Sequence, residues 1–307
     1  MGPDILMLAP LLEEYEELLA KTCSLSRAYT VAEQLALLDD CPERFKVVVT
    51  NGGHGVDPQV LARLPELGLI AVNGVGLDRI DLEETRRRAI SVVTTPDVLT
   101  DAVADLAVGL TLAVLRQIVV ADRFVRSGEW ELRPFKHLGT NLRGQRVGIL
   151  GLGRIGSAIA QRLIPFGAQL AYHNRQPVEG CDFPYCNSLE QLALQSDILI
   201  IAAAGGPQSR HLVSRHVLGA LGETGVVINV ARGSVVDQTA LTDLLLEGRL
   251  AGAGLDVFEE EPKVPATLLG LDNVVVQPHL GSATIQTRQA MAQIVVDAVL
   301  GFCETPA

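Results

Sequence analysis

The sequence predicts an α/β protein with two doubly wound, parallel-sheet domains. Two series of short apolar segments alternate with segments of helical spacing, one ahead of residue 100 and one after residue 145. Several apolar segments end in glycine-rich turns, and the order strand, turn, helix is typical of parallel βαβ units. With 307 residues, the chain is also long enough for two such domains.

The first series lies in the N-terminal part of the chain. It consists of predicted strands at residues 5–9, 46–50, 69–72 and 91–93, and predicted helices at residues 13–21 and 81–88. Two strands run into turns of small residues, Asn51-Gly52-Gly53-His54-Gly55 and Asn73-Gly74-Val75-Gly76. Because glycine lacks a Cβ, such turns let backbone amides approach a bound anion closely.

A long apolar helix is predicted at residues 100–115. A helix that is apolar on most sides must be buried, so we expect it in a domain junction or a subunit interface. Residues 127–140 are predicted to be irregular, and they contain the single tryptophan, Trp130.

The second series predicts a six-stranded sheet. Its strands are expected at residues 146–150, 169–172, 197–202, 225–230, 254–256 and 273–276. Helices are expected at residues 155–163, 189–194 and 239–247, and a final amphipathic helix at residues 291–302. Strands that alternate with helices in this way match a doubly wound sheet.

Composition and charge argue against several kinds of partner. The net charge of −11 disfavours nucleic acid, because neutralising its phosphates needs a basic face. Cys181 and Cys186 lie close together, but no second pair or His cluster completes a zinc pattern, so we expect free thiols and no metal. The N-terminus has no signal-peptide pattern, and the apolar run at 106–120 is too short to span a bilayer. We therefore expect a cytoplasmic protein without a membrane or nucleic-acid partner.

A phosphate-binding loop is predicted directly after the strand at 146–150. The loop reads Gly151-Leu152-Gly153-Arg154-Ile155-Gly156, a GxGxxG pattern that leads into a helix. Gly151 permits the tight turn, Gly153 lets the backbone approach a pyrophosphate, and Gly156 lets the helix pack on the strand. The helix N-terminus adds amide donors and the positive end of a dipole. This context predicts a Rossmann-type dinucleotide site.

The residues after the next strand indicate which dinucleotide binds. An NAD site usually has an acidic residue here to hold the ribose 2′-hydroxyl, whereas this chain has Asn174 and Arg175. An acid would repel a 2′-phosphate, and an arginine can bind it through charge-assisted hydrogen bonds. The sequence therefore predicts a preference for NADPH, with NADH as the alternative cofactor.

Three further polar residues follow later strands of the second series. Arg232, Glu261 and His279 each come after a predicted strand, at the carboxyl edge where ligands of open α/β sheets bind. A histidine can donate a proton to a carbonyl oxygen near neutral pH, and a neighbouring carboxylate would orient it. An arginine can hold a substrate carboxylate and polarise its carbonyl group. This combination suits a 2-oxo acid.

Together these motifs resemble the D-isomer-specific 2-hydroxyacid dehydrogenase family over nearly the whole chain. The resemblance is carried by residues 151–156, Asn229-Val230-Ala231-Arg232-Gly233, Leu255-Asp256-Val257-Phe258 with Glu261-Pro262, and Gln277-Pro278-His279. Residues 100–110 are also similar to the family's first interdomain helix. The resemblance implies a cofactor domain at residues 99–283, inserted into a flavodoxin-like substrate domain at residues 1–98 and 284–307.

The same resemblance implies roles for individual residues. Arg232 would bind and orient substrate, Glu261 would tune the histidine, and His279 would be the general acid and base. Backbone amides of Val75 and Gly76 would bind the substrate carboxylate. Gly53 and His54 would face the same cleft, and His54 is a departure that would alter substrate preference if it points inward. Further cofactor contacts are implied at Val103, Ala203, Pro207, Val230, Ala231, Asp256 and Gly281.

Within the family, two segments resemble the glyoxylate/hydroxypyruvate reductase branch: Asn174-Arg175 and Thr95-Pro96-Asp97-Val98-Leu99-Thr100. The resemblance implies reduction of glyoxylate or hydroxypyruvate to the D-2-hydroxy acid, and a homodimer that joins its cofactor domains through residues 100–120 and the region of Trp130. Hydroxyphenylpyruvate reductases share much of the pattern, and a non-catalytic dinucleotide-sensing relative is a further alternative. Formate dehydrogenase is disfavoured, because that branch has Gln at the position of Glu261.

Overall fold

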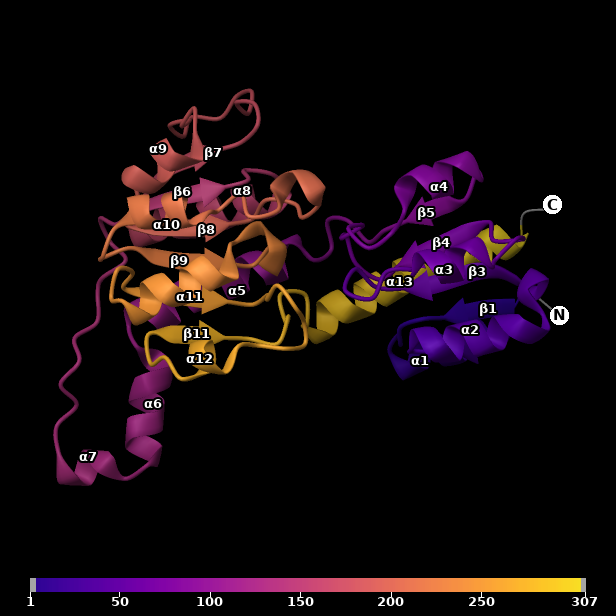
Figure 1. Ribbon diagram of the computed structural model, residues 1–307, viewed down its shortest axis with the longest axis horizontal. Helices are drawn as coiled ribbons and strands as arrows, with labels where there is room; N and C mark the ends of the chain where they lie inside the picture. The colour runs from indigo at the N-terminus through magenta and orange to yellow at the C-terminus, as the bar shows by residue number, and fades with distance from the viewer. Residues whose placement is uncertain (1–3, 305–307) are drawn as a thin grey trace. The chain divides into compact units, whose positions relative to one another are not determined.

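The computed structural model describes residues 4–304 (Figure 1). The chain divides into two compact units. The first unit runs to Leu99 and resumes at Ser282, and the second spans Thr100–Gly281. Each unit holds one parallel sheet, so the predicted α/β class is confirmed.

The first unit is a five-stranded parallel sheet in the order β2-β1-β3-β4-β5. This is the flavodoxin-like strand order. The strands are β1 (Asp4–Met7), β2 (Ser24–Arg27), β3 (Phe45–Thr50), β4 (Leu69–Val72) and β5 (Ser91–Val93). The helices are α1 (Glu13–Ala20), α2 (Val31–Asp40), α3 (Pro58–Ala62), α4 (Leu82–Arg87) and α13 (Ile285–Glu304), with a 3₁₀ turn at Pro42–Arg44.

The two faces of this sheet are buried in separate cores. Alternate residues of β3 point to opposite faces, so Val48 packs with Val60 of α3 while Val47 packs with Val295 of α13. The chain's last helix therefore completes the unit that its first residues begin. It starts at Ile285, well before the predicted residue 291.

The second unit is a six-stranded parallel sheet in the order β11-β10-β9-β8-β6-β7. Its strands are β6 (Arg146–Leu150), β7 (Gln169–His173), β8 (Ile198–Ile201), β9 (Val226–Asn229), β10 (Gly252–Leu255) and β11 (Val274–Val276). Its helices are α5 (Thr100–Leu115), α6 (Ile118–Arg126), α7 (Glu129–Leu132), α8 (Arg154–Leu163), α9 (Leu189–Leu194), α10 (Arg215–Leu221), α11 (Gln238–Leu246) and α12 (Ala266–Leu269), with 3₁₀ turns at Ile164–Phe166, Pro207–Ser209 and Gly233–Val235. Beyond β7, one parallel bridge joins Tyr172 to Tyr185.

Helix α5 owes its apolar character to burial within its own unit. It packs on α8 and on strand β10. Glycines in β10 make this possible, because a Cβ at Gly254 would lie 3.1 Å from Leu110 Cβ. The prediction that this helix is buried is confirmed, but the covering surface is the sheet of the second unit.

Two further expectations are corrected. Residues 127–140 are not wholly irregular, because α7 forms one helical turn beyond α6 (Figure 1). Strand β2 was not expected, because its Ser-Leu-Ser-Arg sequence is short and polar at the sheet edge. In the described part of the chain no single helix is long and apolar enough to cross a membrane. Helices α5 and α6 together have the length and apolar composition of a span, but they are bent by 63° where they meet.

Candidate active site

The loop between β6 and α8 is shaped by its glycines. Gly151 has a φ of 94°, and a Cβ there would lie 2.6 Å from the backbone nitrogen of Ala203. A Cβ at Gly156 would collide with the carbonyl oxygen of Gly151. At Gly153, by contrast, a Cβ would meet nothing within 4 Å. The loop is therefore tight on its inner side and open at Gly153, at the N-terminus of α8, which fits a dinucleotide pyrophosphate.

Asn174 and Arg175 stand beside this loop at the end of β7. The N–H of Leu152 donates to Asn174 Oδ1 at 2.6 Å, so Asn174 fixes the turn that carries the glycines. Arg175 is exposed to solvent. An exposed guanidinium next to the loop is available to an anionic group on a bound dinucleotide.

His279 and Glu261 form a hydrogen-bonded pair at the carboxyl edge of the second unit's sheet. Glu261 Oε2 lies 2.8 Å from His279 Nδ1, and Glu261 Oε1 accepts the N–H of Phe258 at 3.0 Å. Burial disfavours the charged form of Glu261, but the hydrogen bonds from His279 and Phe258 and the charge of Arg232 outweigh it, so the pKa of Glu261 lies below its usual value. The carboxylate therefore stays ionised and orients the imidazole, leaving Nε2 to hold a proton toward a ligand.

Asp256 holds the turn that carries His279. Its side chain is 1% exposed, and its two carboxylate oxygens accept the N–H groups of Leu280 (2.6 Å) and Gly281 (2.8 Å). Burial raises the pKa of Asp256, although both backbone donors favour its charged form. His279 itself has a φ of 56°, a strained conformation for a residue with a side chain. The buried carboxylate keeps the backbone in that conformation.

A second buried polar residue, Asn229, holds the turn that carries Arg232. Its Nδ2 donates to the carbonyl of Arg232 at 3.0 Å, and its Oδ1 accepts the N–H of Ala231 at 3.0 Å. A Cβ at Gly233 would collide with the backbone of Phe258, so glycine is needed where this turn meets the segment that leads to Glu261. The Arg232 guanidinium is half-buried and donates from Nη1 to the Ala231 carbonyl at 2.7 Å.

The other cofactor residues expected from sequence also follow strands of the second unit. Gly281 lies against Val103 of α5, since a Cβ there would be 3.3 Å from Val103 Cγ2. The loops after β8 and β9 contribute Ala203, Pro207, Val230 and Ala231. The GxGxxG loop, the Arg232 turn and the His279 turn therefore share one sheet edge (Figure 1).

The four residues expected to contact substrate besides Arg232 lie in the first unit, at the carboxyl edge of its sheet. Asn51 Oδ1 accepts the N–H groups of Gly53 (3.0 Å) and His54 (2.8 Å) and shapes the turn after β3. The turn after β4, which contains Val75 and Gly76, lies beside it, because a Cβ at Gly74 would be 3.5 Å from the nitrogen of Gly52.

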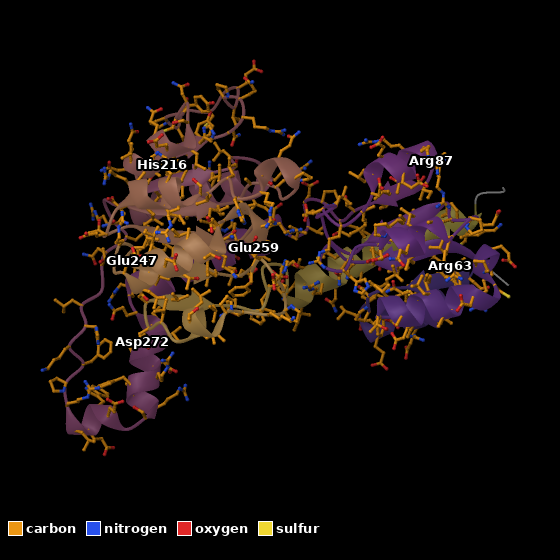
Figure 2. All side chains as sticks on the ribbon, viewed as in Figure 1. Arg63, Arg87, His216, Glu247, Glu259 and Asp272 are labelled. Atoms are coloured by element: carbon orange, nitrogen blue, oxygen red, sulfur yellow. The ribbon has the colours of Figure 1, made fainter. Side chains whose placement is uncertain are left out.

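Two positioning residues were not singled out from sequence. Asn229 is part of the motif at residues 229–233, and an amide side chain at the end of an apolar strand is the sequence feature that could have indicated its role. Glu259 is the other (Figure 2). Its Oε1 accepts a hydrogen bond from Arg210 Nη2 at 2.8 Å and lies 2.7 Å from His211 Nε2, and these contacts join the loop after β8 to the segment after β10. The contacts are between residues far apart in sequence, so no local pattern reveals them. The described residues contain no cluster of potential metal ligands.

Comparison with known proteins assigns the family. The model of the D-isomer specific 2-hydroxyacid dehydrogenase NAD binding domain matches residues 108–281. Hydroxyphenylpyruvate reductase of Plectranthus scutellarioides is 45% identical over 292 residues, covering 95% of this chain and 93% of that protein. Glyoxylate/hydroxypyruvate reductase A of Arabidopsis thaliana is 46% identical with the same coverage of both chains.

A solved structure agrees. The NADPH-dependent glyoxylate/hydroxypyruvate reductase of Sinorhizobium meliloti, in complex with NADP and malonate, superposes with a TM-score of 0.94 at 40% identity, over 99% of this chain and 95% of that one. The family inferred from the motifs is thus confirmed. The chain belongs to the D-isomer specific 2-hydroxyacid dehydrogenases, enzymes that work with a nicotinamide dinucleotide.

Proposed function

We propose that this protein reduces a small 2-oxo acid, glyoxylate or hydroxypyruvate, to the D-2-hydroxy acid with NADPH. The observation that carries the proposal is the 2.8 Å pair of Glu261 and His279 on the same sheet edge as the GxGxxG loop. A dinucleotide-binding protein that only senses its ligand has no need of an oriented, carboxylate-paired imidazole at that edge.

A nicotinamide dinucleotide, when bound by the GxGxxG loop, would supply the hydride for C2 of the 2-oxo acid. His279 donates the proton from Nε2 to the carbonyl oxygen, because its Nδ1 is engaged by Glu261. Glu261 orients the ring and stabilises the imidazolium before transfer. The Arg232 guanidinium binds the substrate and polarises its carbonyl group.

The substrate carboxylate is assigned to the turn after β4. In the described residues the N–H groups of Val75 and Gly76 donate no hydrogen bond, so both are available to an anion. Gly53 and His54, in the adjacent turn after β3, complete this part of the binding site. In this proposal residues 1–98 and 284–307 are the substrate domain and residues 99–283 the cofactor domain.

The preference for NADPH is assigned to Arg175. The relative from Sinorhizobium meliloti is described as NADPH-dependent, and its structure holds NADP. At the end of β7 this chain has the neutral Asn174 where an NAD site usually has an acidic residue. Arg175 beside it is exposed. A 2′-phosphate there meets a cation and no repelling carboxylate. The loop would bind the rest of NADPH through Leu152, Gly153, Arg154 and Ile155.

We further propose a homodimer through α6, α7 and the chain that follows them. Apolar side chains gather there in solvent, with Ile118 51%, Trp130 64%, Leu132 85% and Leu138 91% exposed. Apolar surface of this extent is typical of a protein–protein interface. Sedimentation of the wild type and of Leu132→Glu tests it: the wild type should be a dimer and the variant a monomer, and an unchanged variant dimer would place the interface elsewhere.

A second candidate substrate is 4-hydroxyphenylpyruvate, since the relative from Plectranthus scutellarioides is a hydroxyphenylpyruvate reductase. The experiment is a panel of glyoxylate, hydroxypyruvate, pyruvate and 4-hydroxyphenylpyruvate, each with NADPH and with NADH, read as kcat/KM. Highest values for glyoxylate or hydroxypyruvate with NADPH are expected. Highest values for the aryl substrate would replace the small substrate by the second candidate, and binding of NADPH without turnover of any 2-oxo acid would overturn both.

A further inference from the structure

Gln34 of α2 is fully buried and reaches His54 across the first unit. Its Nε2 lies 3.1 Å from the Ala28 carbonyl and 3.0 Å from His54 Nε2. A carbonyl oxygen can only accept, so the amide group of Gln34 must face Ala28 with its NH₂. Its other atom, Oε1, is buried and has no partner among the described residues.

This contact fixes the tautomer of His54. Because Gln34 Nε2 is a donor, the ring nitrogen it meets must be an unprotonated acceptor, and a neutral imidazole then carries its single proton on Nδ1. Burial and the nearby charge of Arg79 lower the pKa of His54, which keeps the ring neutral at physiological pH. The His54 side chain is thus uncharged and has one N–H to donate, at Nδ1, while its Nε2 accepts from the buried amide of Gln34.

His54 lies in the turn next to the one to which we assign the substrate carboxylate. His54 follows β3, and the turn containing Val75 and Gly76 follows β4, the next strand of the sheet. Within the described residues Nδ1 of His54 has no hydrogen-bond partner. A half-buried donor without an acceptor is suited to an acceptor on a ligand.

We propose that His54 Nδ1–H recognises an uncharged oxygen on C3 of the substrate and so selects 2-oxo acids with a C3 hydroxyl. The inference rests on the proposed function. With the C1 carboxylate assigned to the amides after β4, the substituent on C3 is the substrate group that we assign to the neighbouring turn after β3. A neutral N–H suits a hydroxyl oxygen, whereas a second carboxylate would need a cation for comparable binding.

Hydroxypyruvate and pyruvate test the proposal, because they differ by this one oxygen. His54→Asn and His54→Gln form a matched pair: the amide nitrogen of Asn is bonded to Cγ, as Nδ1 is, while that of Gln lies at the distance of Nε2. The readout is the ratio of kcat/KM for hydroxypyruvate to kcat/KM for pyruvate. His54→Gln should lower this ratio roughly 3- to 10-fold, the worth of one neutral hydrogen bond, and His54→Asn should keep most of it.

Failure of the inference is distinct from failure of the proposed function. A wild type that reduces neither acid defeats the function, whereas a wild type that reduces both, with a ratio unchanged in His54→Gln, defeats only the role of His54. Nitrogen NMR of the ¹⁵N-histidine-labelled protein gives a readout without turnover. His54 should show a protonated Nδ1 and a bare Nε2, and Gln34→Met should return it to a mixture. A protonated Nε2 in the wild type would overturn the proposal.

Discussion

Glu261 and His279, 18 residues apart in the chain, meet with carboxylate and imidazole atoms 2.8 Å apart. Glu261 and His279 lie in the segments that follow β10 and β11, and hydrogen bonds hold each segment in place. Glu261 is anchored by the N–H of Phe258, and the turn of His279 is anchored by the buried Asp256. The pair is therefore positioned by two loops whose backbones are fixed by hydrogen bonds, as an acid–base group must be to deliver a proton in one direction.

Removing the carboxylate of Glu261 should slow proton delivery by His279. In Glu261→Gln the imidazole loses the carboxylate that accepts from Nδ1 and orients the ring, so kcat with glyoxylate and NADPH should fall. Glu247→Gln is the matched control, because Glu247 is an exposed glutamate of the same unit (Figure 2). A kcat in Glu261→Gln that equals that of the control would show that the carboxylate does not act on the histidine.

The same carboxylate should contribute to acid stability. The pKa of Glu261 in the folded protein lies below its ordinary value of 4.5, so its contribution is complete above pH 4.5 and is lost as the pH falls through the lowered pKa. The Tm difference between wild type and Glu261→Gln should therefore shrink as the pH falls below 4.5. A difference that grows in acid would mean that the pKa is raised instead.

Asp256→Asn should damage both stability and turnover. One oxygen becomes an NH₂ that faces a backbone N–H, so a buried donor loses its acceptor at a cost of roughly 1–3 kcal/mol. The turn of His279 also loses an anchor, and kcat should fall. Asp272→Asn is the control, since Asp272 is 73% exposed in a surface ion pair with Arg123 (Figure 2). Chemical denaturation and kcat measured on both variants test the assignment, and equal effects would contradict it.

Arg175→Ala should weaken the use of NADPH selectively. Loss of a charge-assisted contact to a 2′-phosphate should lower kcat/KM with NADPH roughly 10-fold or more, while kcat/KM with NADH, which has no such phosphate, should change little. Arg87→Ala, at an exposed arginine of the first unit, should affect neither cofactor (Figure 2). Parallel loss with both cofactors would assign Arg175 a structural role.

Much of the fold was predictable because buried parallel strands are short, nearly continuous apolar segments. Strands β4, β5 and β6 and helices α5 and α9 lie at the residues expected for them. Strand β2 escaped prediction because an edge strand of four residues, half of them serine, carries no apolar periodicity. The early start of α13 escaped prediction because three of its first four residues, Gln286, Thr287 and Arg288, are polar.

The candidate site divides in the same way. Arg232, Glu261 and His279 belong to local sequence motifs, so their residue types and spacing predicted them as site residues. The residues that hold them in place are less visible, because Asn229 and Asp256 act through backbone groups of turns that exist only in the folded sheet edge. Gln34 is the extreme case. A glutamine in an amphipathic helix gives no sign that it sets the tautomer of a histidine after another strand.

The central claim is that His279 delivers the proton in a 2-oxo acid reduction, and His279→Asn tests it most directly. NADPH oxidation with glyoxylate is followed in the wild type, in His279→Asn and in His216→Asn, whose exposed histidine is the control (Figure 2). His279→Asn should lower kcat by roughly 10²- to 10⁴-fold, the range of general acid catalysis, with an unchanged Kd for NADPH. His216→Asn should match the wild type. A near-normal kcat in folded, NADPH-binding His279→Asn would contradict the claim.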